Sequence, residues 1–280
     1  AAVKRKGTLQ IRMTSEVANN FTSNNTSAES ITIDGETWRN QLQLSYSLTD
    51  KWELSIAIPH VAHDGGSFDG FIEDWHKVFG LPNKARRAVA QNKLNYQWIT
   101  GDTPQANIVK AGGGLGDTRL QLSYHLSYTG NRSIALMGGV KVPTGDTDDL
   151  LGSGSTDMFA GVYLSQLEVF GQPNLTFHSN VGAISLGSSD LARVKDWLGY
   201  GSASLVWHRW ERVSLKTQID MHSAIYDSRL KELGDFSAQL SIGGTVAVSD
   251  RASLDIAVVE DIATDTSSDV VFHFSLRYQF

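Results

Sequence analysis

The sequence contains no cysteine, only 5 prolines and no long hydrophobic run. Without cysteine, disulfides, thiolate metal sites and cysteine nucleophiles are excluded. No stretch approaches the roughly 18 apolar residues that a membrane-spanning helix needs. The net charge of −6 excludes a broad electrostatic contact with nucleic acid. The 280 residues suit one large domain or two small ones, and a mean hydropathy of −0.20 would by itself suggest a soluble protein.

Apolar and polar residues alternate along most of the chain. Between Arg119 and Tyr128, leucine or tyrosine occupies every second position, and polar residues occupy the positions between. Because successive side chains of a strand point to opposite faces, this period of two predicts β-strands. The pattern recurs in twelve segments, which are 7–18, 36–48, 52–62, 117–128, 133–143, 156–168, 173–185, 196–208, 212–225, 234–248, 252–262 and 268–280.

The connections between these segments alternate in length. Turns after the even-numbered segments are short, such as Thr49-Asp50-Lys51, whereas most connections after the odd-numbered ones are longer, up to residues 63–116. Short periplasmic turns and long extracellular loops are typical of outer-membrane barrels. A length of about 11 residues also matches a tilted membrane-spanning strand. We therefore predict an all-β fold, a transmembrane antiparallel β-barrel of 12 strands that forms a single domain over residues 1–280.

A soluble β-sandwich also has strands with one apolar face. Here, however, aromatic residues such as Trp52, Trp197 and Trp207 lie at the ends of the apolar faces, where an interfacial girdle is expected. The last segment carries one continuous apolar and aromatic face, formed by Val270, Phe272, Phe274, Leu276, Tyr278 and Phe280. A terminal strand of this kind resembles the signal that the bacterial outer-membrane assembly machinery reads. Both features favour the barrel.

The expected location is the bacterial outer membrane. The chain starts Ala1-Ala2-Val3 without a charged and then apolar leader, so we expect that a signal peptide has been removed. Absence of cysteine suits passage through an oxidising periplasm. The expected partners are outer-membrane lipid and lipopolysaccharide, the assembly machinery during biogenesis, and a small-molecule solute, but no nucleic acid.

The longest loop, residues 63–116, contains a helical pattern. Phe71, Ile72, Trp75 and Phe79 form one apolar stripe of a short amphipathic helix. We expect this helix to fold into the barrel mouth as a plug or gate. Two alternatives are a helix lying on the membrane surface and a purely structural lid.

Two further features follow in the same loop. The basic cluster of Lys84, Arg86 and Arg87 would suit lipopolysaccharide phosphates, although a solvated basic face is more common. Residues 93–98 alternate again, which predicts a short hairpin arm.

The lumen is the enclosed polar surface of such a barrel, so its lining decides the function. Alternation predicts inward-facing charged and histidine side chains of both signs: Arg12, Glu16, Glu53, Arg119, His125, Lys141, Lys216, Asp220, His222, Asp255, His273 and Arg277. A channel that strongly selects one ion sign would show rings of one charge. The mixture indicates either paired charges that fill the lumen or a path for a polar or zwitterionic solute.

The residue types of a hydrolase are present, but not in a catalytic arrangement. Asp220 and His222 lie two positions apart on the same face of one predicted strand, with Ser214 further along it. At this spacing the two side chains stand side by side, about 7 Å apart. No Gly-x-Ser-x-Gly elbow is present. We therefore expect no enzymatic activity.

The glycine-rich and acidic runs also have structural explanations. Gly112–Gly116 is not followed by the Gly-Lys-Ser/Thr of a nucleotide-binding loop, and a transition from loop to strand explains it better. Asp146, Asp148 and Asp149, near Asp157, could hold Ca²⁺, but a solvated acidic loop is the commoner case. We expect no cofactor and no resident metal.

Glu260 departs from the alternation, which turns it toward lipid beside Val258 and Ile262. Either it lies at the external rim, or a β-bulge near Val259 turns it inward. We favour the bulge, which would bring Glu260 near the basic cluster at residues 84–87.

Several motifs resemble those of known barrels. They are Gly114-Leu115-Gly116-Asp117, Lys141-Val142-Pro143-Thr144-Gly145-Asp146, Gly152-Ser153-Gly154-Ser155-Thr156-Asp157, Phe71-Ile72-Glu73-Asp74-Trp75-His76, Phe79-Gly80-Leu81-Pro82 and Val259-Glu260-Asp261. Together they resemble a proteobacterial family of outer-membrane barrels of unknown function, over nearly the whole chain. The glycine-rich runs are also similar to the barrel family named for the MetA pathway of phenol degradation. The resemblance implies a fold and a location, and no functional residue.

These patterns together predict a passive, loop-gated channel for a small solute. The likeness to the MetA-pathway barrels would suit an aromatic or amphipathic solute, including one that enters sideways through the wall near Gly199 and Gly201. The alternative is a closed barrel, a structural or interaction protein that binds a partner or lipopolysaccharide through its external loops.

Overall fold

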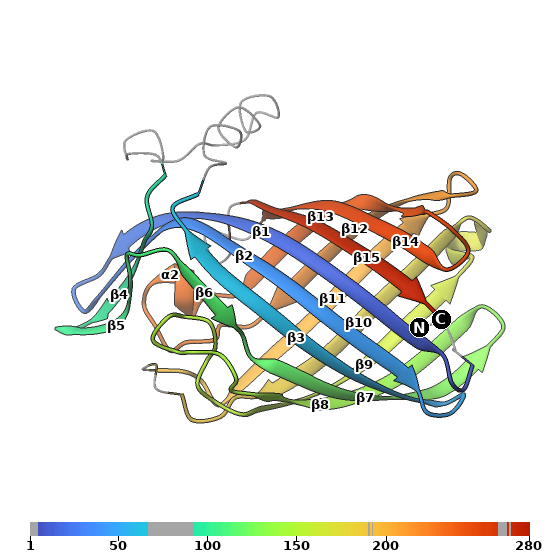
Figure 1. The fold of residues 1–280 in the computed structure, drawn as a ribbon, viewed down its shortest axis with the longest axis horizontal. Coiled ribbons are helices and arrows are strands. Elements are labelled where there is room, and N and C mark those ends of the chain that lie inside the picture. The colour runs from blue at the N-terminus through green and yellow to red at the C-terminus, as the bar shows by residue number, and fades with distance from the viewer. Residues whose placement is uncertain (1–4, 67–91, 190, 192, 263–267, 269) are drawn as a thin grey trace.

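The structure is a computed structural model, and it describes residues 5–66, 92–189, 191, 193–262, 268 and 270–280. In this part of the chain, twelve antiparallel strands form a closed barrel (Figure 1). They are β1 (Leu9–Asn25), β2 (Glu29–Ser47), β3 (Trp52–Asp64), β7 (Thr118–Thr129), β8 (Arg132–Val142), β9 (Asp157–Leu167), β10 (Leu175–Ser185), β11 (Trp197–Trp207), β12 (Val213–His222), β13 (Ser237–Ala247), β14 (Ala252–Asp261) and β15 (Val270–Gln279).

The barrel closes between its first and last strands. β1 and β15 are antiparallel from the pair Gln10 and Gln279 to the pair Asn19 and Val270. The start of β1 and the end of β15 lie at the same end of the barrel as the short turns (Figure 1). Closure leaves no free strand edge within the wall, as a membrane-spanning sheet requires. The predicted fold class and strand order are confirmed.

The apolar residues of these strands face outward. Leu120, Leu122, Ile256 and Phe274 are large side chains left exposed on the outer wall. Aromatic pairs mark the end with the short turns, among them Trp52 and Tyr124, whose ring centroids are 4.6 Å apart. Because lipid replaces water around such a wall, the exposed apolar band stabilises the barrel in a membrane. Among the described residues, no helix has the length and apolar character to span a membrane.

β1 and β2 continue well beyond the predicted segments. Their outer halves form a long hairpin, and β4 (Asn95–Thr100) and β5 (Thr103–Ile108) add to it in the order β5-β4-β2-β1. We call this four-stranded sheet the extension (left end of Figure 1). The hairpin arm predicted at residues 93–98 is confirmed as β4 and β5. β6 (Gly112–Leu115) pairs with the outer end of β3.

The extension packs on loops that belong to distant strands. Ile31, Trp98 and Leu230 form a buried apolar cluster, with Tyr226 packed against it. Leu230 lies beside the short helix α2 (Lys231–Gly234), in the loop between β12 and β13. Since β13, β14 and β15 separate β12 from β1 in the sheet, this contact bridges the extracellular end of the barrel instead of following its wall.

The bulge predicted near Val259 is wrong. Val258, Val259 and Glu260 pair in unbroken register with Phe272, Val271 and Val270. Glu260 therefore keeps its outward parity, and β14 ends one residue later, at Asp261. The carboxylate lies at the extracellular rim, where no bulge is needed to bring it to water. The predicted helix with Phe71, Ile72, Trp75 and Phe79, and the basic cluster at residues 84–87, lie outside the described residues.

Candidate functional site: the lumen of the barrel

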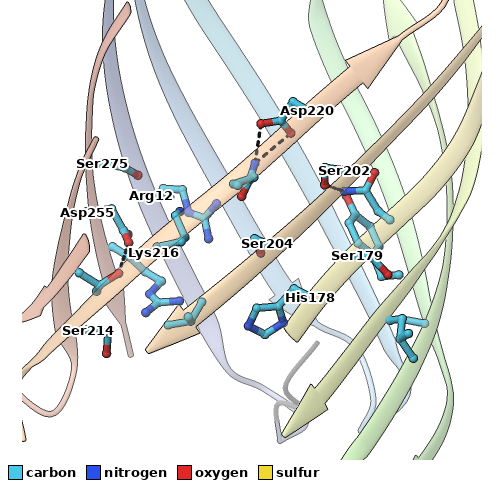
Figure 2. Close-up of a pocket in the computed structure, with 18 of the residues that line it drawn as sticks. Arg12, His178, Ser179, Ser202, Ser204, Ser214, Lys216, Asp220, Asp255 and Ser275 are labelled. Carbon is cyan, nitrogen blue, oxygen red and sulfur yellow. Dashed lines mark hydrogen bonds between the residues drawn. The ribbon is translucent and has the colours of Figure 1, made fainter. Parts of the chain in front are cut away.

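The lumen contains two polar cavities that adjoin each other. The larger has a volume of about 790 Å³ and is lined from nearly every side of the barrel (Figure 2). The second, of about 500 Å³, shares Lys216, Gln218, Asp220 and His273 with the first. It continues to Thr37 and Val259, toward the extracellular end. The two cavities therefore follow one another along the barrel.

Most of the residues predicted to line the lumen border these cavities. The larger cavity contacts Arg12, Glu53, His125, Lys216, Asp220, Asp255, His273 and Arg277. Glu16 borders the second cavity. Serine, threonine and amide side chains fill the positions between, and Asn180 donates to Ser202 Oγ over 2.5 Å. The lining is that of a polar, hydrated space.

Three predicted residues lie elsewhere. Arg119 borders neither cavity, although it interacts electrostatically with Glu16 and Tyr163. His222, at the outer end of β12, donates from Nδ1 to the carbonyl of Ser223 and borders a smaller cavity. Lys141 is bound to carboxylates at the base of the extracellular loops.

Several of the described charged groups that line the cavities form no salt bridge. Glu16 accepts a hydrogen bond from His273 Nδ1 at 2.9 Å. In the described residues Arg12, Arg277 and Lys216 form no salt bridge, and neither do Asp220 and Asp255. Asp220 accepts from the Gln218 amide at 2.8 and 2.9 Å, and Asp255 accepts from the Thr245 hydroxyl. The charge network that would fill a closed lumen is therefore not formed by these groups.

The three glycine-rich runs meet at the cluster of Asp117, Lys141 and Asp157. Lys141 Nζ lies 2.9 Å from Asp117 Oδ2 and 2.7 Å from Asp157 Oδ2. Burial opposes the ionisation of Asp117, but donation from the Ser153 amide, from Lys141 and from the Gly145 amide outweighs it and lowers the pKa of Asp117. The Asp117 carboxylate is charged and held by three segments.

This cluster accounts for a glycine and for an acidic residue of the sequence. A Cβ atom at Gly152 would lie 2.2 Å from Asp117 Oδ1, so only glycine allows this approach. Asp157, considered above with the acidic loop as a Ca²⁺ ligand, is neutralised by Lys141. Among the described residues, no group of histidine and acidic side chains could hold a metal ion.

His208 and His222 form no catalytic triad with Ser214. Ser214 contacts His208 Nδ1 at 2.9 Å, and His208 Nε2 contacts the Thr176 hydroxyl at 3.1 Å, which leaves no carboxylate to orient the ring. His222 is at the other end of β12 from Ser214. This arrangement lacks the third group of a triad.

Sequence reasoning missed Arg39 and His208 as lumen residues. Arg39 borders the second cavity and pairs in register with Glu16. Its signal was present, because Arg39 has the same parity as the inward-facing Gln41 and Gln43. His208 follows the last residue of β11 and lines the larger cavity from the turn.

The closed wall, the outward apolar face and the polar lumen define an outer-membrane β-barrel. Residues 2–280 match the profile of a family described as protein of unknown function (DUF3187), and the chain belongs to this family.

Among solved structures, the chain is similar to the COG4313 outer membrane channel from Pseudomonas putida F1, with a TM-score of 0.62 and 14% sequence identity over 99% of this chain and 96% of that one. It also resembles the NanC porin, with a TM-score of 0.51 and 8% identity over 97% and 98% of the two chains. Both likenesses are likenesses of fold. Comparison with curated proteins gives no significant match.

Proposed function

We propose that the protein is a passive outer-membrane channel for small polar solutes. The observation that carries this proposal is the succession of two adjoining cavities whose lining includes charged groups of both signs, several of them without a salt bridge among the described residues. Charges that serve only to fill a barrel are expected to neutralise each other, because an unpaired charge in a closed interior is costly. Charges that face a hydrated solute path keep their favourable interaction with water.

The polar lining also indicates the chemical class of the solute. An aromatic or amphipathic solute was suggested by the family resemblance. The cavities have a few apolar lining residues, such as Leu164 and Val259, but most of the lining is arginine, lysine, carboxylates, histidines, hydroxyl-bearing residues and amides. Polar lining groups recognise polar solutes through hydrogen bonds. We therefore propose a path along the lumen, and not the sideways path through the wall near Gly199 and Gly201.

We infer that the extracellular loops gate the path. The extension contacts loops from the far side of the opening, with Trp98 and Tyr226 4.9 Å apart between ring centroids and Glu232 accepting from Asn24 at 3.0 Å. A sheet held across the opening in this way narrows the entrance. A few such side-chain contacts contribute little stability, so this part of the molecule can open locally, as is required of a gate.

The proposal is tested by single-channel conductance with two tryptophan variants on the same strand. Ser204 lines the larger cavity, whereas Ala203 has the opposite parity on β11 and faces the outer wall. We expect Ser204→Trp to lower the conductance by about half or more, because an indole fills much of a narrow lumen. Ala203→Trp should leave it unchanged.

Folding is checked for each variant by its heat-modifiable migration on a gel. Absence of discrete steps from folded wild-type protein would contradict the channel. That result would favour the other function considered from the sequence, a closed barrel whose external loops bind a partner or lipopolysaccharide.

A further inference from the structure

Four inward-facing arginines lie on one side of the lumen. Arg277 is on β15, Arg12 on β1, Arg39 on β2 and Arg119 on β7, and only β3 of the same wall contributes none. We call these four residues the arginine ladder. Arg12 and Arg277 face each other directly in the register of β1 and β15.

The ladder runs along the barrel axis. Arg39 is level with Glu16, four residues further along β1 than Arg12. At about 3.3 Å per residue this separates the two rungs by roughly 13 Å along the strand. Arg119 lies near the outer start of β7 and repels Arg39 electrostatically. Arg12 and Arg277 thus form an inner rung, and Arg39 and Arg119 an outer one.

No carboxylate neutralises the ladder by a salt bridge in the part of the chain that the structure describes. Two carboxylates share its wall, Glu16 and Glu53, and Glu16 is engaged by His273. Moreover, Arg12 Nε is a buried donor without a protein partner there. Like charges placed directly opposite each other destabilise a sheet, so the repulsion between the two arginines of the inner rung costs stability. Asp255 and Glu53 act against this repulsion at Arg12 electrostatically, without a salt bridge to it among the described residues.

A ligand that supplies negative charge would remove this cost. Guanidinium groups bind carboxylates through two parallel hydrogen bonds, and two neighbouring guanidinium groups suit one carboxylate better than a single one does. Tyr163, on β9, lines the larger cavity and interacts electrostatically with both Arg12 and Arg119. Of the other carboxylates of the larger cavity, Asp220 lies on β12, away from the ladder's wall, whereas Asp255 lies on β14 beside β15 and interacts electrostatically with Arg12.

We propose that the arginine ladder makes the lumen selective for small carboxylate-bearing solutes, which pass from the outer rung to the inner one. This inference rests on the proposed channel and names its solute class. A solute that also carries an amine would be served by Asp220 and Asp255, so zwitterions belong to this class, whereas neutral hydrocarbons do not.

The experiment measures the reversal potential of the purified protein in planar bilayers across a gradient of KCl, and then of potassium gluconate. We expect the anion-to-cation permeability ratio to exceed 1 in wild type. It should fall by about twofold or more in Arg12→Gln/Arg277→Gln, because fixed charge within a Debye length of the path sets the ion ratio. Arg39→Gln/Arg119→Gln should act in the same direction.

A matched control removes two cations outside the lumen. Lys51 and Arg251 are exposed in short turns, and Lys51→Gln/Arg251→Gln changes the net charge by the same amount. This variant should retain the wild-type ratio. Cation selectivity in wild type, or a ratio that the ladder variants do not move, would overturn the proposal while leaving a channel.

If the folded wild type does not conduct, the proposed channel function is wrong. The proposed role of the arginine ladder is then tested by calorimetric measurement of gluconate binding. Binding that disappears in Arg12→Gln/Arg277→Gln and persists in the control would establish a carboxylate site in a closed barrel. No binding to wild type would overturn both proposals.

Discussion

Lys141 joins two carboxylates that lie far apart in the sequence. Asp117 and Asp157 are only 9% and 8% exposed, and the ammonium group contacts both of them and Ser153. Removal of one partner from a buried ion pair leaves the other charges without compensation. At the scale of the residue, this makes Lys141 a position where charge matters more than volume.

We predict that Lys141→Met destabilises the barrel by about 3–5 kcal/mol, because it leaves two buried carboxylates unpaired. The free energy of unfolding can be measured from the loss of heat-modifiable folded protein in urea. Lys216→Met is the matched control, since the Lys216 ammonium forms no salt bridge in the described residues, and it should cost less than about 1 kcal/mol. Equal losses in the two variants would contradict this assignment.

At the scale of the element, the extension is attached to the loops by a buried carboxylate. Glu29, whose side chain is fully buried, accepts hydrogen bonds from Arg193 Nη1 at 3.0 Å, Ser228 Oγ at 2.9 Å and the Arg229 amide at 2.9 Å. Burial opposes ionisation, but these donors prevail and lower the pKa of Glu29 below its ordinary value of 4.5. The carboxylate is therefore charged when the extension is docked.

We predict that acid loosens the docked extension. A carboxylate with a lowered folded-state pKa contributes stability that is full above its unfolded-state pKa of about 4.3 and is lost as the pH falls through the folded-state value. Hydrogen exchange of residues 29–33 and 223–236 should accelerate between about pH 5 and pH 3, while β8 and β9 stay protected. In Glu29→Gln the exchange of these segments should already be fast at neutral pH and should lose this dependence. An unchanged acid response in that variant would assign the effect to another group.

The element scale also separates what the sequence could predict from what it could not. All twelve barrel strands follow from the period of two, because lipid outside and water inside impose opposite polarity on alternate residues. The outer parts of β1 and β2, residues 20–25 and 29–34, lie beyond the pairing of β1 with β15, where no lipid imposes that contrast. Residues 20–25 contain a single apolar side chain, Phe21, and the alternation of Ile31 and Ile33 spans too few residues to stand out, so the predicted segments ended too early.

For the lumen, the sequence likewise predicted which residues face inward, but not the contacts between them. Parity assigns Arg12, Asp255 and Arg277 to the inner face, but it does not say which charges reach each other. Asp255 accepts a hydrogen bond from Thr245, whereas Lys141 pairs with Asp117, which precedes β7 and has no strand parity to reveal it. Contacts between loops and strands depend on the three-dimensional path of the chain, and period-two reasoning contains no information about that path.

At the scale of the whole molecule, the strand pairing of the barrel does not depend on all of its extracellular parts. The segment from Gly65 to Leu94 leaves and rejoins the sheet at neighbouring points, since Glu36 pairs with Asp64 and Asp34 pairs with Asn95. Gly65 also lies close to Asn92, so its position for a Cβ atom is 2.5 Å from the Asn92 carbonyl oxygen. A short linker can therefore replace residues 67–91 and leave every strand pairing of the described residues in place.

We predict that this deletion yields a folded barrel with a higher single-channel conductance than wild type, by about twofold or more if the segment narrows a water-filled path. Both attachment points lie at the extracellular end, and the deletion removes no residue of the arginine ladder. The anion-to-cation ratio should consequently stay on the same side of 1 while the conductance rises. A rise in conductance with loss of selectivity would move the selective element from the lumen to the loop. Unchanged conductance in a folded variant would assign the gate to the docked extension alone.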